Sequence, residues 1–401
     1  MSLKNLIRGK IHYVGVNDRT KHLFEALWPL PYGVSYNSYL IDDDVVALID
    51  TVDICYFEVY LRKIRSIIGD RPIQYLIINH MEPDHSGSIS LIKQHYPDIT
   101  IVGNKLTFGM LQGFYGVNCA EHHLVADGDL LDLGHHKLRF YLTPMVHWPE
   151  TMMTYDESEG LLFSGDAFGC FGTVDGGFLD TAINTSRFWD EMTRYYSNIV
   201  GKYGIPVQKA LAKLNGQITI NALCSTHGPV WTGDNVCRVI DVYDRLSRYD
   251  ADEGVVIAYG SMYGNTEAMA EAVAAELSAQ GIRNVVMHNL SKSHASYVIA
   301  DIFRYRGLIV GSPTYNGGLF PDVEALLSKI AGRDMKERYV GYFGSFTWAG
   351  TAVKQLNAFV EKSKFEPVGQ PVEMKQAMTP DVYRACEALA VAMADRLRQD
   401  R

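Results

Sequence analysis

Cysteine is scarce in this chain and never occurs in the C-x-x-C spacing. Six cysteines are present among 401 residues, too few for the framework of a small disulfide-stabilised protein. Zinc ribbons and rubredoxin-type iron knuckles need paired thiolates at that spacing. Both kinds of thiolate site are therefore excluded.

Long apolar runs and an excess of positive charge are also missing. No stretch of 18 apolar residues occurs, which excludes a transmembrane helix, and the N-terminus MSLKNLIRGK lacks the apolar core of a signal peptide. Lys and Arg total 37 against 46 Asp and Glu, a formal charge of −9, whereas nucleic-acid binders carry a basic surface. We expect a soluble cytoplasmic protein without a nucleic-acid or membrane partner.

The length predicts two or three domains, and one junction stands out. The polar segment 248–254 ends in Gly254 just before an apolar stretch, which is a usual form of domain boundary. Before it, short apolar runs bounded by Asp, Gly or Pro indicate strands, with helical stretches between some of them. We expect strands at 37–41, 45–49, 75–78, 99–102, 138–142, 161–163 and 223–225, and helices at 55–68, 88–95 and 186–200. This mixture favours a layered α/β domain over residues 1–250 rather than an all-β barrel.

After the junction, strands and helices alternate regularly. We expect strands at 255–259, 285–288, 307–310 and 339–343, and helices at 266–279, 323–330, 351–362 and 380–398. Alternation of this length predicts a parallel, doubly wound sheet in a second domain over residues 251–401. Ligands of such sheets bind beyond the carboxyl ends of the strands.

Potential metal ligands gather at the ends of the strands expected in the first domain. Four of them lie within six residues, and three more stand singly after later strands. They are His80, Glu82, Asp84, His85, His147, Asp166 and His227. Imidazoles mixed with carboxylates suit zinc or iron better than copper or calcium.

A lone histidine beside a strand is usually only a polar group with a partner, and we assign no catalytic role to His122, His123, His135 or His136. Seven candidates at strand ends are harder to attribute to packing. Seven also exceed the four ligands of a structural zinc site, so the pattern predicts two metal ions. Asp166 is the natural bridge, because one carboxylate has two oxygens for two ions.

Three loops of the second domain follow strands and are rich in small residues. Segment 261–266 precedes a helix, where amides and hydroxyls favour a phosphate group, and it is neither a G-x-G-x-x-G fingerprint nor a P-loop. Segments 311–318 and 344–350 contain several glycines and an aromatic side chain suited to stacking on a planar ring. Together they predict a pocket with a phosphate at one end and a ring at the other.

Both halves of the chain resemble flavodiiron proteins, also called A-type flavoproteins. His80-x-Glu82-x-Asp84-His85, followed by His147, Asp166 and His227, is similar to their metallo-β-lactamase-like domain, an αββα sandwich. The hydrolytic members of that superfamily have histidine at the position of Glu82, and the harder carboxylate favours iron. The resemblance implies one iron at His80, Glu82 and His147 and another at Asp84, His85 and His227, bridged by Asp166. His85 is a variable ligand in the family.

The three loops resemble those of flavodoxin, which binds FMN. The resemblance implies that 261–266 holds the phosphate and that the later loops flank the isoalloxazine, with Tyr315 and Trp348 as aromatic neighbours of the ring. The implied FMN-binding residues are Ser261, Met262, Tyr263, Gly264, Asn265, Thr266, Pro313, Thr314, Tyr315, Asn316, Gly317, Ser345, Phe346, Thr347, Trp348, Ala349 and Gly350. No catalytic residue is expected beyond the metal ligands.

A flavin together with a metal centre indicates a reductase. The leading hypothesis is an FMN- and di-iron-dependent oxidoreductase that reduces dioxygen to water, nitric oxide to nitrous oxide, or both. One alternative is a zinc-dependent hydrolase of the metallo-β-lactamase superfamily, which two zincs and no iron would favour. Another is a non-enzymatic electron carrier or gas sensor, which absence of turnover with reduced flavin would favour.

The choice between the two gases stays open at this stage. Some family members have a histidine near the metals at what resembles the position of Glu25, and the acid here weakens any inference of oxygen preference. The adjacent Tyr195 and Tyr196 approach the pocket as well, although neighbouring tyrosines on a helix are usually one core and one surface residue.

Electrons must reach the flavin from outside the sequence. We expect no fused rubredoxin and no fused flavin reductase domain, so that a separate rubredoxin-like protein or a reduced deazaflavin is the donor. The resemblance also implies a head-to-tail homodimer, or a dimer of dimers, in which the flavin of one subunit faces the irons of the other.

Overall fold

The computed structural model describes residues 5–117 and 122–400. The first four residues of the segment tested for a signal peptide lie outside these ranges. The chain divides into two compact units, Met1–Tyr196 with Tyr203–Asp244 and Ser197–Lys202 with Arg245–Arg401. The proposed domain boundary after residue 250 stays a prediction. Within the described ranges, no helix has the length and hydropathy needed to cross a bilayer.

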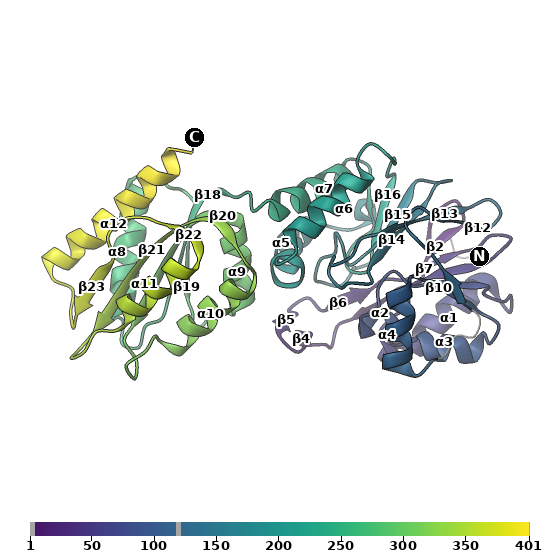
Figure 1. Ribbon diagram of the computed structural model, residues 1–401, viewed down its shortest axis with the longest axis horizontal. Coiled ribbons are helices and arrows are strands. Elements are labelled where there is room, and N and C mark those ends of the chain that lie inside the picture. Colours follow the sequence, from purple (N-terminus) through teal and green to yellow (C-terminus); the bar gives the residue numbers. More distant parts are fainter. Residues whose placement is uncertain (1–4, 118–121, 401) are drawn as a thin grey trace. The chain divides into compact units, whose positions relative to one another are not determined.

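Two sheets form the centre of the first unit, with helices beside each (Figure 1). In spatial order the first sheet contains β1 (Leu6–Arg8), β2 (Ile11–Tyr13), β7 (Tyr39–Ile41), β8 (Ala47–Ile49), β9 (Tyr75–Ile77), β10 (Thr100–Gly103) and β11 (His122–Leu124). The second contains β12 (Leu130–Asp132), β13 (Lys137–Leu142), β14 (Met152–Asp156), β15 (Leu161–Gly165), β16 (Ala222–Ser225) and β17 (Trp231–Thr232). Two short ribbons pair β3 (Val16–Asp18) with β6 (Val34–Tyr36) and β4 (Leu23–Phe24) with β5 (Trp28–Pro29).

Helices α1 (Phe57–Ile68), α3 (Ile89–His95) and α4 (Lys105–Tyr115) lie beside the first sheet, and α5 (Ser186–Tyr195), α6 (Gly204–Leu214) and α7 (Asp234–Ser247) beside the second (Figure 1). Local sequence sets their ends. The side chain of Asn104 accepts hydrogen bonds from Leu106 N and Thr107 N at the start of α4, and Gly116 ends that helix at φ +62°. The predicted αββα sandwich is confirmed.

The helix expected over 186–200 is interrupted. α5 ends at Tyr195, and Tyr196–Val200 continues as one π-helical turn. The observed ends of strands and helices differ by a few residues from those predicted. For example, α1 begins at Phe57, after a 3₁₀ turn at Ile54–Tyr56. Such end positions depend on capping rather than on the apolar pattern.

The second unit contains one sheet in which every pairing is parallel. Its strands are β19 (Val285–Asn289), β18 (Asp252–Tyr259), β20 (Tyr305–Pro313), β21 (Lys336–Phe346) and β22 (Lys364–Pro367) in spatial order, and β23 (Val372–Lys375) also pairs with β21. Its helices are α8 (Asn265–Ala279), α9 (Ala295–Arg304), α10 (Pro321–Gly332), α11 (Ala352–Lys362) and α12 (Pro380–Arg398). The strand order by chain position, 2-1-3-4-5, confirms the doubly wound, flavodoxin-like sheet.

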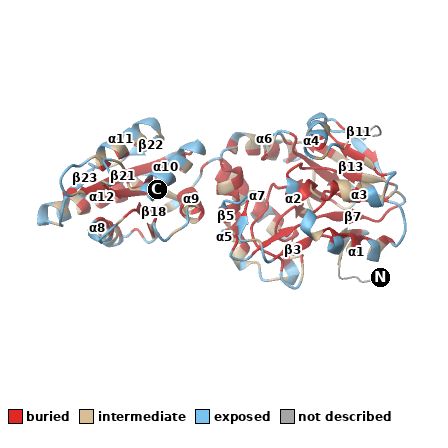
Figure 2. Cartoon of the chain, turned by 90° about the horizontal axis from the view of Figure 1, so that it is seen from below, coloured by how far each residue is buried: buried red, intermediate tan, exposed pale blue. Residues whose placement is uncertain are grey.

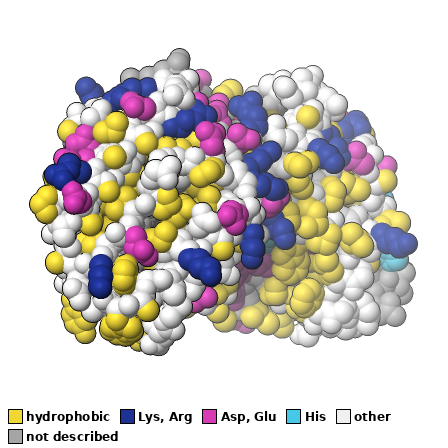
Figure 3. Space-filling model, turned by 60° about the vertical axis from the view of Figure 1, so that its left-hand side comes forward, with side chains coloured by type: hydrophobic (Ala, Val, Ile, Leu, Met, Phe, Trp, Pro, Cys, Tyr) yellow, Lys and Arg dark blue, Asp and Glu magenta, His cyan; other side chains and the backbone are white. Residues whose placement is uncertain are grey.

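The core of the second unit lies between the sheet and helices α8 and α12. Val255 and Ile257 of β18 are fully buried there with Met269 of α8 and Met393 of α12. In both units the strands are mostly buried, while the outer sides of helices and the loops are exposed (Figure 2). Hydrophobic side chains also reach the surface between scattered charged groups (Figure 3).

A fully buried arginine ties three segments of the second unit together. Arg338, which is 1% exposed, donates hydrogen bonds to the backbone carbonyls of Ile302 (2.6 Å), Phe303 (2.8 Å) and Tyr249 (2.7 Å). Burial lowers the pKa of this guanidinium to about 10. Its donors satisfy carbonyls at the end of α9 that would otherwise be buried without partners.

We expect Arg338→Met to destabilise the second unit by roughly 2–4 kcal/mol, because several buried carbonyls lose their donor. Urea unfolding followed by circular dichroism measures the loss. Arg384→Met is the matched control, since Arg384 forms only an exposed ion pair with Asp381 on α12, and it should change stability by less than about 1 kcal/mol. Equal effects of the two variants would contradict the role given to Arg338.

Candidate functional site

The loop after β9 carries four of the seven predicted ligands and is fixed at its start by a buried carboxylate. Asp50, which is 3% exposed, accepts hydrogen bonds from the backbone N–H groups of Asn79 (2.8 Å) and His80 (3.3 Å). The chain then forms the short helix α2 (Pro83–Ser86), with proline at the first helical position. This single turn brings neighbouring residues of the chain into one site.

The other three predicted ligands come from the second sheet. His147 lies in the loop between β13 and β14, Asp166 follows β15, and His227 follows β16. β15 and β16 are parallel neighbours, so their carboxyl ends lie side by side. Gly228 has φ +84°, and a Cβ there would lie 2.2 Å from Cys170 Sγ, so this turn requires glycine.

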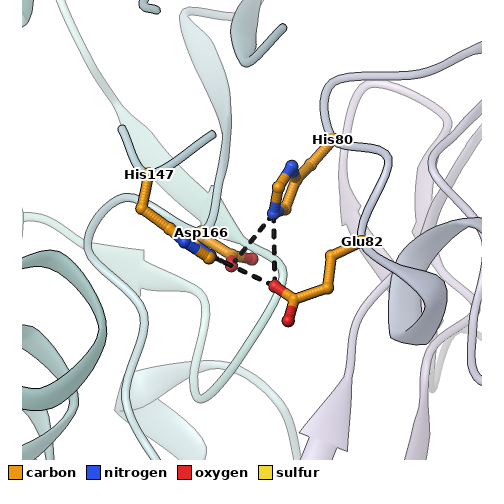
Figure 4. A group of neighbouring side chains, drawn as sticks. All are labelled: His80, Glu82, His147 and Asp166. Atoms are coloured by element: carbon orange, nitrogen blue, oxygen red, sulfur yellow. Dashed lines mark hydrogen bonds and ion pairs between the residues drawn. The ribbon is translucent and has the colours of Figure 1, made fainter. Parts of the chain in front are cut away.

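His80, Glu82, His147 and Asp166 form the first group of ligands (Figure 4). His147 Nε2 lies 3.1 Å from Glu82 Oε2 and 2.9 Å from Asp166 Oδ2. His80 Nε2 lies 3.3 Å and 3.6 Å from the same two oxygens. All four side chains are buried, and their donor atoms converge on one point.

Asp84, His85 and His227 form the second group, and Asp166 joins it to the first. The ring nitrogens of His85 and His227 each lie 3.4 Å from Asp84 Oδ2. Asp166 Oδ1 lies 3.0 Å from His85 Nε2 and 3.7 Å from His227 Nε2, whereas Asp166 Oδ2 faces the first group. The two oxygens of this carboxylate therefore face different groups.

Outer hydrogen bonds orient two of the imidazole rings. His227 Nδ1 donates to the carbonyl of Ser35 at 2.7 Å, which leaves Nε2 as the atom directed at the second group. His80 Nδ1 lies 2.8 Å from Glu150 Oε1, which directs His80 Nε2 at the first group in the same way.

Opposite charges hold each other ionised in this cluster. Burial would raise the pKa of Asp166, but His85 and His80 hold that pKa well below its ordinary value. Burial would lower the pKa of His85 and of His147, but their carboxylate neighbours outweigh it and raise each pKa to about 9. The carboxylates thus require positive charge beside them, which protons or a metal cation can supply.

The donor set fits two metal ions. Both oxygens of Asp84 are buried and have no hydrogen-bond partner within the described ranges, as a ligand oxygen reserved for a cation would be. His85 Nε2 and His227 Nε2 approach to 3.1 Å, two ring nitrogens aimed at the same place. Imidazoles and carboxylates in each group suit iron or zinc.

Aromatic side chains cover one side of the second group. Phe24 lies edge-on to the ring of His227, with ring centroids 5.3 Å apart, and Tyr195 lies 5.6 Å from the same ring. The Tyr195 hydroxyl is buried without a hydrogen-bond partner among the residues described. Tyr196 is buried too, against Tyr243, so the expectation of one core and one surface tyrosine was wrong. The two tyrosines lie where α5 passes into the π-helical turn, and this end of α5 is buried on all sides.

Glu25 lies in the turn between β4 and β5. It is exposed, has φ +49°, and its carboxylate accepts a hydrogen bond from the indole N–H of Trp28 at 2.9 Å. The turn adjoins Phe24, which packs against the ring of His227. Glu82 and His147 of the first group and Asp84 of the second act electrostatically on the Glu25 carboxylate, so Glu25 lies close to both groups without belonging to either.

A cavity of about 420 Å³ opens at the carboxyl ends of β18, β20 and β21. Its lining comprises Ser261, Met262, Tyr263, Asn265, Thr266, Pro313, Thr314, Tyr315, Asn316, Gly317, Ser345, Phe346, Thr347, Trp348, Ala349 and Gln376. The three predicted loops thus surround one cavity, and of the residues proposed there only Gly264 and Gly350 lie outside its lining.

The cavity offers suitable chemistry at both ends. Asn265 begins α8, and the start of that helix together with the hydroxyls of Ser261 and Thr266 forms an end of the cavity suited to an anion. Thr266 Oγ1 and Ser345 Oγ are 2.8 Å apart and link two of the loops. Trp348 is 88% exposed and Tyr263 90%, so both rings are free to cover a planar ligand.

Sequence reasoning missed two residues of these sites. Glu150 follows His147 by three residues, and its burial and its hydrogen bonds with His80 and Met81 distinguish it from a surface acid. Gln376 lies in the turn after β23, where its backbone N–H donates to the carbonyl of Phe346 at 2.8 Å. Glu150 lies in a loop, and the strand before Gln376 was not among those expected from the sequence.

Comparison with known proteins matches both units. The model of the ODP family beta lactamase matches residues 34–228, and the flavodoxin model matches residues 257–389. The anaerobic nitric oxide reductase flavorubredoxin of Vibrio vulnificus (strain YJ016) is 31% identical over 384 residues, which cover 94% of this chain and 76% of that protein. That of Citrobacter koseri is also 31% identical, over 386 residues, with 94% and 78% covered.

Solved structures agree with this match. Rubredoxin oxygen:oxidoreductase from the anaerobe Desulfovibrio gigas superposes with a TM-score of 0.93 at 30% identity and covers 97% of each chain. The flavodiiron protein of Giardia intestinalis gives a TM-score of 0.91 at 27% identity, covering 97% of this chain and 95% of that one. A β-lactamase-like metal centre and a flavodoxin-like cavity in one chain define the class of protein. The chain belongs to the flavodiiron protein family and is an oxidoreductase.

We expect Asp166→Ala to lose iron from one or both groups while a flavin stays bound, because the shared carboxylate and the flavin cavity lie in different units. Metal analysis and the flavin-to-protein ratio of the same sample check this. Loss of flavin together with iron would contradict the independence of the two sites. Circular dichroism controls for unfolding.

Proposed function

We propose that this protein is an FMN- and di-iron-dependent oxidoreductase that reduces dioxygen to water, nitric oxide to nitrous oxide, or both. The observation that carries the proposal is the pair of facing ligand groups that share Asp166 and include the carboxylate of Glu82. A third imidazole in place of Glu82 would suit hydrolytic zinc better. The flavin cavity in the same chain supplies the second half of a redox enzyme.

His80, Glu82 and His147 would hold one iron, Asp84, His85 and His227 would hold the other, and Asp166 would be shared between them. FMN occupies the cavity of the second unit, with its phosphate at the 261–266 loop and its ring between the two later loops. The burial of all seven metal ligands and the unpartnered oxygens of Asp84 support this assignment. The size of the cavity suits a ligand such as FMN.

When bound, the di-iron centre would supply a site that polarises the gas together with two electrons, and reduced FMN would supply two more. Dioxygen takes up four electrons and four protons to form two waters, and two nitric oxides take up two electrons and two protons to form nitrous oxide and water. The chain's contribution is placement: Ser35 and Glu150 orient the rings of His227 and His80. Phe24 and Tyr195 provide a dry wall suited to an apolar diatomic molecule.

The names of the relatives divide between the two gases. The Vibrio relative is named a nitric oxide reductase and the Desulfovibrio structure an oxygen oxidoreductase, at 31% and 30% identity. We therefore propose activity toward at least one of them. The name of the Desulfovibrio structure, rubredoxin oxygen:oxidoreductase, also supports a rubredoxin-type protein as the electron donor.

We further propose that the active form is a head-to-tail homodimer or a dimer of such dimers. Irons and flavin lie in different units of the chain, and fast electron transfer needs the cofactors of the two kinds close together. The exposed rings of Trp348 and Tyr263 beside the flavin cavity support a protein contact there, because exposed aromatic groups mark interfaces.

We expect protein reconstituted with FMN and ferrous iron to consume dioxygen or nitric oxide when reduced through a rubredoxin system, with iron as the active metal. Anaerobic turnover of each gas, metal analysis and a ferric absorption band measure this. Full activity of zinc-loaded protein would sink the assignment of iron. Ester or thioester hydrolysis with two zincs would favour the hydrolase, and no turnover of either gas with reduced flavin would favour a carrier or sensor.

Subunit complementation tests the dimer. We expect neither Asp166→Ala, which lacks iron, nor Asn265→Glu, which places a negative charge where the phosphate binds, to turn over gas alone. After subunit exchange, mixed dimers contain one intact flavin facing one intact di-iron centre, so activity should return. If the mixture stays inactive while both parents are folded, or if wild-type monomers are active, the cross-subunit arrangement is wrong.

A further inference from the structure

A carboxylate with no access to solvent stands behind one of the metal-ligand histidines. Glu150 is 0% exposed, and its Oε1 accepts hydrogen bonds from His80 Nδ1 (2.8 Å) and from the backbone N–H of Met81 (2.9 Å). Its Oε2 is buried and has no hydrogen-bond partner in the part of the chain that the structure describes. Burying a carboxylate costs several kcal/mol unless nearby positive charge offsets it. A neutral hydrogen-bond acceptor would be enough to orient the ring of His80. The negative charge of Glu150 therefore needs a further explanation.

The backbone around Glu150 holds this carboxylate in place. Asn104, the N-cap residue of α4, donates a side-chain hydrogen bond to the carbonyl of Glu150. Thr151, the next residue, donates through its hydroxyl to the carbonyls of Thr143 and Trp148. The carboxylate is therefore fixed against the imidazole by the fold, independently of any metal ion.

Among the described residues, no carboxylate outside the two ligand groups contacts a ring nitrogen of the second group, although Asp50, which accepts from two backbone N–H groups, lies near His85. His227 Nδ1 donates to the neutral carbonyl of Ser35, and His85 Nδ1 is buried without a hydrogen-bond partner among the described residues. The hydroxyl of Thr226 also donates to Asp166 Oδ1, the oxygen that faces this group. That hydrogen bond draws negative charge away from the second group, whereas Glu150 adds it to the first. The two metal positions therefore differ in what contacts the outer nitrogens of their imidazole ligands: a carboxylate behind His80, a neutral carbonyl behind His227.

Granted the proposed di-iron centre, we propose that Glu150 is a positioning residue that makes the two irons unequal. Its carboxylate fixes the ring of His80 and stabilises the ferric state at the His80–Glu82–His147 position. The first electron to reach the oxidised centre therefore resides at the Asp84–His85–His227 position. The physical reason is that a nearby negative charge attracts a trivalent ion more strongly than a divalent one.

Two substitutions separate orientation from charge. Glu150→Gln keeps an amide oxygen that accepts from His80 and Met81 but removes the negative charge, and Glu150→Leu removes both. Asp156→Asn is the matched control. Asp156 is also 0% exposed and lies 3.2 Å from Nδ1 of the buried His136, which belongs to neither ligand group.

The first measurement is an anaerobic titration of metal-free protein with ferrous iron. We expect two binding phases, of which Glu150→Gln weakens one by about 10- to 100-fold and leaves the other unchanged. Asp156→Asn should change neither phase. Equal weakening of both phases, or wild-type affinities in Glu150→Gln, would overturn the proposal.

The second measurement is a redox titration of the iron-loaded protein, with the half-reduced centre followed by electron paramagnetic resonance. Removing the charge should raise the lower of the two iron potentials and so bring the two potentials closer together. We therefore expect the half-reduced form to reach a smaller maximum in Glu150→Gln than in wild type or Asp156→Asn. A larger maximum would show that the first electron resides on the other iron. If the maximum were unchanged in Glu150→Gln but changed in Glu150→Leu, Glu150 would only orient the ring of His80, and its charge would have no effect on the irons. Failure of the wild-type protein to bind two irons would instead contradict the proposed function.

Discussion

Asp166 is the residue on which the metal centre depends, because each of its carboxylate oxygens faces a different group of ligands. It follows β15, and His227 follows the parallel neighbour β16, so the pairing of these two strands already brings a carboxylate and an imidazole together. The loop after β9 then approaches from the other sheet with four more donors. The ligands from the two sheets can meet only if both sheets end close to the carboxylate of Asp166. The positions of the other ligands depend on this packing of the sheets.

Burying so many ionisable groups costs free energy unless each buried charge has an opposite charge or a hydrogen-bond partner beside it. Within each group the imidazoles and carboxylates neutralise one another, as the lowered pKa of Asp166 and the raised pKa values of His85 and His147 indicate. Behind the ligands, Asp50 holds the backbone of the first loop and Ser35 holds the ring of His227. These partners belong to strands or strand ends, which makes the ligand positions as rigid as the sheets themselves.

The two units use the same structural solution for different chemistry. In each, the functional loops follow the carboxyl ends of strands, where side chains and amides are free of the sheet's own hydrogen bonds. The first unit fills these positions with imidazoles and carboxylates, and the second with hydroxyls, glycines and exposed aromatic rings such as Trp348. Enclosure of the metal centre suits the proposed reduction of a small diatomic gas, and the open cavity suits a flavin that would receive electrons from a separate donor.

The order of residues along the chain predicted a layered α/β first domain, a doubly wound second domain and most of the residues gathered at both candidate sites, whereas the αββα sandwich was implied by the family resemblance. Apolar runs that end in His80, Asp166 or His227 identify strand ends, and loops at strand ends converge in any layered α/β sheet. The pattern could not reveal Glu150, Gln376 or the burial of Tyr196, because none of them stands at the end of a regular apolar run. Glu150 contacts His80 through a hydrogen bond across the fold, and Tyr196 packs against Tyr243 of α7. Periodicity along a chain reports which face of an element is buried, but which polar group lies behind a ligand is decided only when the sheets pack together.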